Sequence, residues 1–225
     1  MADSVGKCAK CPFASNERIC KNKGGRGPDW CCTKLYPQMV ERANAEYEKA
    51  PALMAFARNA SIQEAECYVP SMINEDRYQP VKSRLQEIIE FCQKQGYKRL
   101  GLAFCLVLKE EARIFNSIME SHGFEMVSVV CKIGGTDKGF LGVGPEQRID
   151  KGCEYETMCN PIAQAMVLNE ENTELNILLG LCVGHDSMFM KYSEAPVTVF
   201  AVKDRLLGHN PLAALYSQYY GYLKK

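Results

Sequence analysis

The chain has 225 residues, 47% of them hydrophobic, which is enough to bury one domain core of ordinary size and to carry a small additional module. Its 27 Lys and Arg residues balance its 27 Asp and Glu residues, so net charge gives no indication of binding to nucleic acid or to an anionic membrane. The N-terminus lacks a signal-peptide pattern and no apolar run approaches the roughly 18 residues of a membrane span, so we expect a cytoplasmic protein.

The cysteine count narrows the function classes. Twelve cysteines in a protein of a reducing compartment are poor candidates for six structural disulfides, so metal ligation or thiol chemistry is the better interpretation. Free cysteine is also a common core residue. We assign Cys67 and Cys92 to packing, because Cys92 shares the apolar face of a predicted helix with Ile88 and Ile89.

Residues 1–35 form the first predicted module. They are short of aliphatic side chains and show no helical or alternating period, so this segment needs a metal to fold. The cysteines are spaced Cys8-x2-Cys11-x8-Cys20-x10-Cys31, with Cys32 adjacent. A C-x2-C pair chelates one centre, and the later cysteines complete a four-thiolate set around zinc or an iron–sulfur cluster. The spacing leaves open whether Cys31 or Cys32 is the fourth ligand, and a disordered basic tail is the alternative.

Residues 36–75 form a predicted helical connector. Good helix formers run from Tyr36 to about Cys67, and Pro51 indicates two helices joined near Ala50. We assign residues 76–225 to an α/β domain.

The first half of that domain alternates helices and strands. Pro80 opens an amphipathic helix that ends at Gly96, and the strand Lys98 to Cys105 follows. A helix from Glu110 to His122 then leads to the strand Glu125 to Cys131. Such alternation predicts a doubly wound, mostly parallel sheet of the Rossmann or flavodoxin-like class.

A long irregular stretch, 133–155, leaves the second of these strands. It contains GGTDKGFLGVG but closes on no Gly-Lys-Ser/Thr and lacks the order of a dinucleotide fingerprint, which argues against nucleotide binding. Loops of this length inside a domain are often lids, so we expect it to fold over a crevice at the sheet edge. Its Cys153 is a reserve ligand candidate. Pro161 then begins a helix immediately after Cys159 and Asn160.

The most apolar stretch is the run Leu175 to Leu181, which ends in Cys182. It predicts a central strand buried on both faces. Pro196 to Val202 reads as one more strand, and Asn210-Pro211 caps a last helix, LAALYSQYYGYL. Short connections suggest the strand order 2-1-3-4, numbered along the chain.

Three candidate strands therefore finish on cysteine, at Cys105, Cys131 and Cys182. The carboxyl edge of an open parallel sheet is where ligands bind, and Cys159 at a helix N-terminus adds a fourth sulfur to that edge. These thiolates suit an iron–sulfur cluster, zinc or copper(I). His185 is an alternative ligand or a hydrogen-bond donor that tunes the centre.

Two cysteine sites in one chain favour iron–sulfur chemistry over zinc, because an electron needs an entry point and a destination. We therefore predict 4Fe–4S clusters, with zinc as the alternative at the N-terminal site, and a redox or electron-transfer role that includes a possible oxidoreductase. The implied partners are a redox protein or a small-molecule substrate, not nucleic acid or a membrane.

Two further hypotheses stay open. In the first, Cys182, His185 and Asp186 act as nucleophile, base and orienting acid of a thiol enzyme. In the second, the protein is a non-catalytic zinc sensor or scaffold, since ligands alone do not reveal an open coordination position.

The motifs CNPIAQA, LGLCVGHDSMFMKYSEAPVT and KDRLLGHNPLAALY, together with the N-terminal CxxC module, resemble a prokaryotic family of uncharacterised metal-binding proteins. The resemblance covers most of the chain and implies metal binding without naming a metal or a reaction. One departure is that Cys32 follows Cys31 where a proline is expected.

Overall fold

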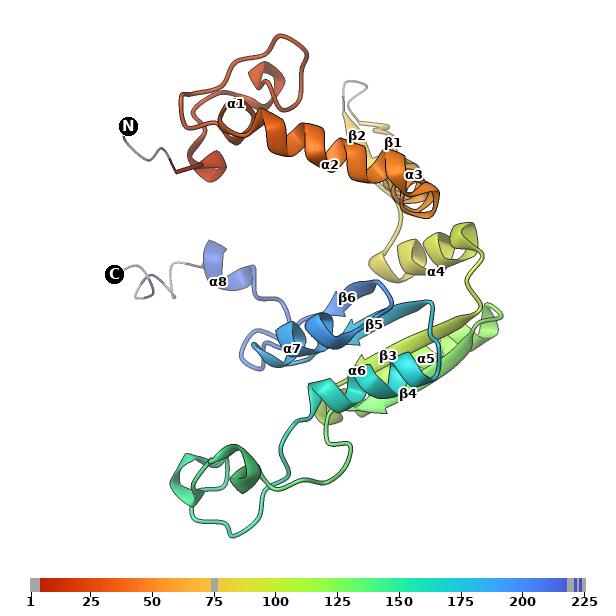
Figure 1. The fold of residues 1–225 in the computed structure, drawn as a ribbon, viewed down its shortest axis with the longest axis vertical. Coiled ribbons are helices and arrows are strands. Elements are labelled where there is room, and N and C mark those ends of the chain that lie inside the picture. The colour runs from red at the N-terminus through yellow and green to blue at the C-terminus, as the bar shows by residue number, and fades with distance from the viewer. Residues whose placement is uncertain (1–4, 74–76, 218–220, 222, 224–225) are drawn as a thin grey trace. The chain divides into compact units, whose positions relative to one another are not determined.

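A computed structural model describes residues 5–73, 77–217, 221 and 223. The chain divides into two compact units, Met1–Ile62 and Gln63–Lys225, which we describe separately (Figure 1). The three-part division expected from composition, with boundaries near residues 35 and 75, remains a prediction. No helix among the described residues combines the length and the apolarity needed to cross a membrane.

The first unit consists of short turns followed by helices. Its elements are η1 (Cys8–Lys10), η2 (Ser15–Glu17), α1 (Cys32–Leu35), α2 (Pro37–Lys49) and α3 (Pro51–Glu66), whose last turn belongs to the second unit. The break between α2 and α3 falls at Ala50, which confirms the predicted pair of helices. Cys31 is the one buried hydrophobic residue among the described residues of this unit. Its cysteine-rich part therefore has almost no apolar core.

The second unit begins with a hairpin that the sequence did not predict. Strands β1 (Tyr68–Pro70) and β2 (Tyr78–Pro80) pair antiparallel. The prediction that Pro80 opens a helix is wrong, because α4 (Arg84–Gln95) begins after Ser83, whose side chain accepts a hydrogen bond from the Gln86 N–H. The predicted end is confirmed, since Gly96 caps α4 in the left-handed conformation.

The centre of the unit is a four-stranded parallel sheet. Its strands are β3 (Arg99–Phe104), β4 (Glu125–Val130), β5 (Leu175–Leu179) and β6 (Val197–Ala201), in the order β4-β3-β5-β6. This is the predicted order 2-1-3-4. Every residue of β5 is buried, as expected for a central strand covered on both faces.

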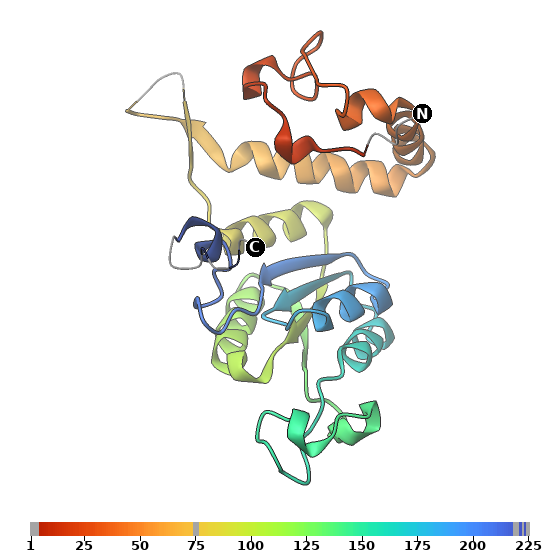
Figure 2. The same cartoon turned by 90° about the vertical axis from the view of Figure 1, so that its left-hand side faces the viewer.

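Helices cover both faces of this sheet (Figure 2). On one face α4 and α5 (Lys109–Ser121) pack against alternate strand residues such as Leu102 and Ile177. On the other face α6 (Pro161–Glu170) and α7 (His185–Tyr192) pack against Ala103 and Leu178. Helix α7 was missed by the sequence analysis, which assigned no element to residues 185–192.

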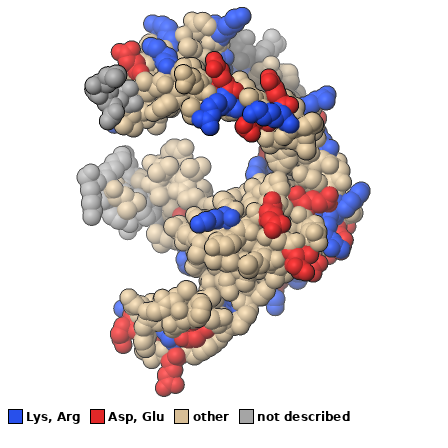
Figure 3. Space-filling view, viewed as in Figure 1, with Lys and Arg blue, Asp and Glu red and all other residues tan. Residues whose placement is uncertain are grey.

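Short elements complete the unit. Segment 132–158 leaves β4 and returns to α6 through η4 (Lys138–Leu141) and η5 (Pro145–Gln147), and it projects away from the sheet (Figure 1). The turn η3 (Leu106–Leu108) joins β3 to α5. The predicted last helix is represented by α8 (Ala213–Tyr216), and residues 218–220 and 222 of its sequence lie outside the described residues. Charges of both signs are interspersed over the surface, in keeping with the zero net charge (Figure 3).

Candidate metal centre

The register of β3 and β4 brings two cysteines to the same level of the sheet edge. Phe104 pairs with Val130, so the next residues, Cys105 and Cys131, leave the sheet side by side. Both are buried, with 7% and 3% of their surface exposed. Their sulfurs share a hydrogen bond.

A third cysteine joins them from the residues just before α6. Cys159 lies next to Asn160, whose N–H donates to the Cys131 carbonyl at 2.8 Å and whose side chain caps α6 by accepting from the Ala163 N–H at 3.0 Å. The Cys159 sulfur is hydrogen-bonded to Cys131 and to the His185 side chain. The side chains thus form a continuous series, Cys105–Cys131–Cys159–His185, from four separate elements. We call these four residues the thiol site.

Interactions within the thiol site give its three cysteines different pKa values. The hydrogen bond from Cys131 lowers the pKa of Cys105 to about 5, helped by the Val107 N–H and by Lys203. The hydrogen bond from Cys131 and then that from His185 lower the pKa of Cys159 to about 4. The pKa of Cys131 is strongly raised, because its proton is shared with both neighbours. Two sulfurs of the three therefore favour the thiolate form, which is the form that binds metals.

Backbone N–H groups add to this preference. The Leu106 N–H donates to Cys131 Sγ at 3.4 Å, and the Val107 N–H points to the Cys105 sulfur. Both come from η3, where the chain turns from β3 into α5. Amide dipoles aimed at sulfur stabilise negative charge there, as helix N-termini do.

Cys182, the fourth predicted ligand, has a different partner. Arg205 Nη2 donates to Cys182 Sγ at 3.0 Å. The His185 and Asp186 N–H groups donate to the Cys182 carbonyl, and the His185 side chain is bonded to Cys159 rather than to the Cys182 sulfur. The structure thus joins three of the four predicted sulfurs and gives the fourth a guanidinium partner. Asp186 Oδ1 accepts a hydrogen bond from the Ser187 N–H at 2.7 Å. Asp186 therefore uses this oxygen next to its own position in the chain rather than on the His185 ring.

Within the described residues, no three Cys, His, Asp or Glu side chains have their donor atoms arranged around one point as a metal requires. In the thiol site the sulfurs interact in pairs, Cys105 with Cys131 and Cys131 with Cys159. A metal replaces the protons that such pairs share when it binds.

The cysteines of the first unit are only partly gathered. The Cys32 backbone N–H and then the Cys32 side chain lower the pKa of Cys8, whereas the Cys8 side chain raises the pKa of Cys32. The Cys11 N–H donates to the Cys8 carbonyl at 3.2 Å, and Cys20 is exposed. The half-buried Cys153 lies in segment 132–158, where its carbonyl accepts a hydrogen bond from Arg148.

The two cysteines assigned to packing are buried. Cys92 is fully buried in the core under α4, and burial raises its pKa to about 12. Cys67 is 5% exposed and donates to the Gln63 carbonyl at 3.0 Å. The packing interpretation is confirmed for both.

Three residues that the sequence analysis missed lie against the site. Gln164 Nε2 donates to the carbonyls of Phe104 and Val129 at 3.3 and 2.7 Å, which ties α6 to the ends of β3 and β4. Lys203 is buried near Cys105, and Arg205 contacts Cys182. The available signal was a pair of basic residues just after the predicted strand Pro196 to Val202.

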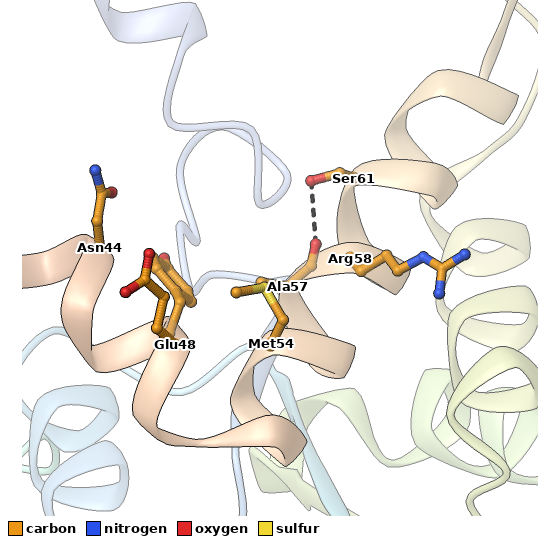
Figure 4. A pocket seen from close by; sticks show the side chains of 7 residues that line it. Asn44, Glu48, Met54, Ala57, Arg58 and Ser61 are labelled. Carbon is orange, nitrogen blue, oxygen red and sulfur yellow. Dashed lines mark hydrogen bonds between the residues drawn. The ribbon is translucent and has the colours of Figure 1, made fainter.

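A concave surface elsewhere in the chain has no thiol chemistry. The groove between α2 and α3, with a volume of 480 Å³, is lined by residues that include Glu48, Met54 and Arg58 (Figure 4). Its Ser61 hydroxyl is already bonded to the Ala57 carbonyl at 3.0 Å. It lacks cysteine and histidine, so the thiol site remains the candidate centre.

Fold and site together define a cysteine-rich α/β protein with a thiol cluster at the carboxyl edge of a parallel sheet. The chain belongs to the family described as "Protein of unknown function (DUF1847)", whose model matches residues 31–200. It is also 44% identical over 219 residues to an uncharacterised protein of Methanocaldococcus jannaschii, with 97% of each chain covered. The matched family residues include the whole thiol site.

Proposed function

We propose that the thiol site binds an iron–sulfur cluster through Cys105, Cys131 and Cys159, with Cys182 as the fourth ligand. The observation that carries the proposal is that three cysteines far apart in sequence meet at one sheet edge, where the β3–β4 register and the Asn160–Cys131 hydrogen bond bring them close enough to shift one another's pKa. Random burial of cysteine, as at Cys92, places a thiol among aliphatic side chains instead.

The donor set fits such a centre chemically. Thiolates are soft ligands suited to iron–sulfur clusters, and the N–H groups of Leu106 and Val107 stabilise negative sulfur. His185 would hold the Cys159 sulfur by a hydrogen bond and so tune the centre. A bound cluster would supply one-electron transfer. The chain's own residues position the sulfurs and keep Cys105 and Cys131 away from water.

The parallel sheet with helices on both faces supports a doubly wound, Rossmann- or flavodoxin-like fold, in which ligands bind at this edge. We propose a second metal centre in the first unit, held by Cys8, Cys11, Cys20 and either Cys31 or Cys32. The Cys8–Cys32 contact and the nearly absent apolar core support it. The role would be that of a cytoplasmic electron-transfer protein or oxidoreductase, with a redox protein or a small molecule as partner.

Iron and acid-labile sulfide analysis after anaerobic purification tests the thiol-site assignment. We expect iron and sulfide in the unmodified protein, a clear loss of both in Cys131→Ala, and no loss in Cys92→Ala, which removes an equally buried thiol outside the site. Equal iron in the two variants would contradict the assignment. A colourless protein that holds only zinc would favour the sensor or scaffold hypothesis.

A further inference from the structure

In the segment that follows β6, successive side chains point in alternating directions, toward the sheet edge and away from it. Residues Lys203, Asp204 and Arg205 begin the KDRLLGHN motif. Asp204 Oδ1 accepts from the Leu206 and Leu207 N–H groups at 3.2 and 3.0 Å, which closes a turn. The side chains on either side of Asp204 reach the sheet edge, where Lys203 approaches Cys105 and Arg205 contacts Cys182.

Lys203 is held in place at the end of the central strand. Its N–H donates to the Leu181 carbonyl at 3.2 Å, and only 9% of its surface is exposed. A β-carbon placed on Gly180 would lie 3.7 Å from Lys203 Cε, so the lysine stem passes directly over the end of β5.

The ammonium group of Lys203 has no hydrogen-bond partner of normal geometry among the described residues. An ammonium removed from water without a partner is costly, and such groups persist where an opposite charge compensates them. The Cys105 sulfur lies close enough to interact with the ammonium charge, since Lys203 is one of the groups that lower the pKa of Cys105. Asp204, its chain neighbour, is already used within the turn.

Arg205 supplies a second cation on the same side. Its Nη2 lies 3.0 Å from Cys182 Sγ, and a guanidinium donates to a thiolate more strongly than to a neutral thiol. The two cations therefore face the two strand-end sulfurs of β3 and β5.

We propose that Lys203 and Arg205 are the counter-cations of an anionic, sulfur-rich centre in the thiol site, with Lys203 donating to a thiolate or an inorganic sulfide of that centre. This inference rests on the proposed function. One-electron reduction by an external one-electron donor adds one negative charge to the centre and breaks no bond. Cations beside the centre stabilise the reduced form, so they raise its reduction potential.

Redox titration of the holoprotein tests the role of Lys203. In Lys203→Met the ratio of reduced to oxidised centre at a fixed potential should fall about tenfold, which for one electron corresponds to a shift of about 59 mV to more negative potential. Lys203→Arg should keep the reduction potential close to that of the unmodified protein, because arginine preserves the positive charge. Lys98→Met is the matched control, because Lys98 is an exposed lysine at the opposite, amino edge of the same sheet. An unchanged potential in Lys203→Met would overturn the inference for Lys203.

Alkylation of Cys182 tests Arg205 without a metal. Iodoacetamide reacts with the thiolate, so in chelator-treated protein Arg205→Met should slow the labelling of Cys182 several-fold at neutral pH, and Arg205→Lys should slow it less. Equal rates in all three proteins would overturn the inference for Arg205. If the unmodified protein retains no iron and sulfide, the proposed function fails, and this labelling comparison alone decides whether the segment provides counter-cations.

Discussion

At the scale of single residues, the geometry of the thiol site depends on a side chain that carries no sulfur. The Gln164 side chain is fully buried, and its Nε2 bridges the carbonyl of Phe104, the last residue of β3, and that of Val129, next to the last residue of β4. Because Gln164 lies on the helix that follows Cys159, it fixes the spacing between that cysteine and the strands that end in Cys105 and Cys131. It is a positioning residue.

Replacing Gln164 by leucine keeps the volume and removes both donors. The two carbonyls then lose a buried partner, which costs about 1–3 kcal/mol of unfolding free energy. We expect that loss in urea denaturation, together with lower metal retention. Gln86→Leu is the control, because Gln86 is an exposed glutamine bonded to Glu90 and should change stability by less than about 0.5 kcal/mol. Equal stability of the two variants would show that the bridge is unimportant.

The positions of the site cysteines could be predicted from the sequence, but the side chains that contact them could not. A cysteine at the end of an apolar run can be located from periodicity, because the strand sets where it ends. Gln164, Lys203 and Arg205 could not be found this way, since a glutamine in a helix and basic residues after a strand usually face water. Which way a side chain turns there depends on neighbours that are distant in sequence.

At the scale of elements, the turn η3 connects packing to sulfur chemistry. Leu108 closes this turn and is 6% exposed, while Leu106 and Val107 direct their N–H groups to the thiols. Opposite the turn, Gly180 ends the central strand with a φ of +71°. A β-carbon at Gly180 would lie 2.1 Å from Leu108 Cδ1. The glycine is therefore required for both its conformation and its lack of a side chain.

Gly180→Ala should displace η3 and weaken the centre. The left-handed conformation alone costs an alanine roughly 1–2 kcal/mol, and the contact with Leu108 adds about 1–3 kcal/mol. Gly123→Ala is the matched control, since Gly123 has a φ of +86° and open space around it. Thermal unfolding and metal content measure both effects. If the two variants lose the same stability and keep the same metal, η3 is not held by this contact.

Segment 132–158 has a polar core of its own. Arg148 is 6% exposed and pairs with Asp137 at 2.9 Å. Asp137 also accepts from the Glu156 and Gly139 N–H groups, which hold its pKa below the ordinary 3.8, with Arg148 contributing less. The segment is thus ordered by Asp137 together with Glu156, which pairs with Lys138 and accepts from the Ile149 N–H at 2.8 Å, although the sequence analysis expected an irregular lid.

The Asp137 carboxylate makes the segment acid-sensitive. A lowered folded-state pKa means that the stabilisation is complete above the ordinary value and is lost as the pH falls through the lower, folded-state value. We expect hydrogen exchange in 133–158, corrected for the intrinsic rate, to accelerate below about pH 4. In Asp137→Asn the segment should exchange faster already at neutral pH and respond less to acid, with the remaining response coming from Glu156, whose pKa is lowered by Lys138 and the Ile149 N–H. An acid response identical in both proteins would assign the sensitivity to another group.

Element positions were predictable where one face or both faces are apolar. Strands β3 and β5 and the order of the sheet followed from buried runs and short connections, because parallel strands with helical crossovers have few topologies. The hairpin β1–β2 and helix α7 were missed. The hairpin is mostly exposed, and α7 buries only Phe189 among the residues that the structure describes, so neither has a strong apolar period.

At the scale of the whole molecule, the chain carries two groups of cysteines in two separate units. Cys8 and Cys32 approach each other in the first unit, and the thiol site lies entirely in the second. Each group has its own local elements, so loss of one should leave the other intact. This separation permits the sheet-edge site to be studied alone.

X-ray absorption spectroscopy of anaerobically purified Cys8→Ser/Cys32→Ser protein tests the central claim most directly, because the remaining metal reports the sheet-edge site. We expect iron with a shell of sulfur neighbours, lost when Cys131→Ala is added. Iron or zinc surrounded only by nitrogen and oxygen, or a sulfur shell that survives Cys131→Ala, would contradict a centre held by Cys105, Cys131 and Cys159.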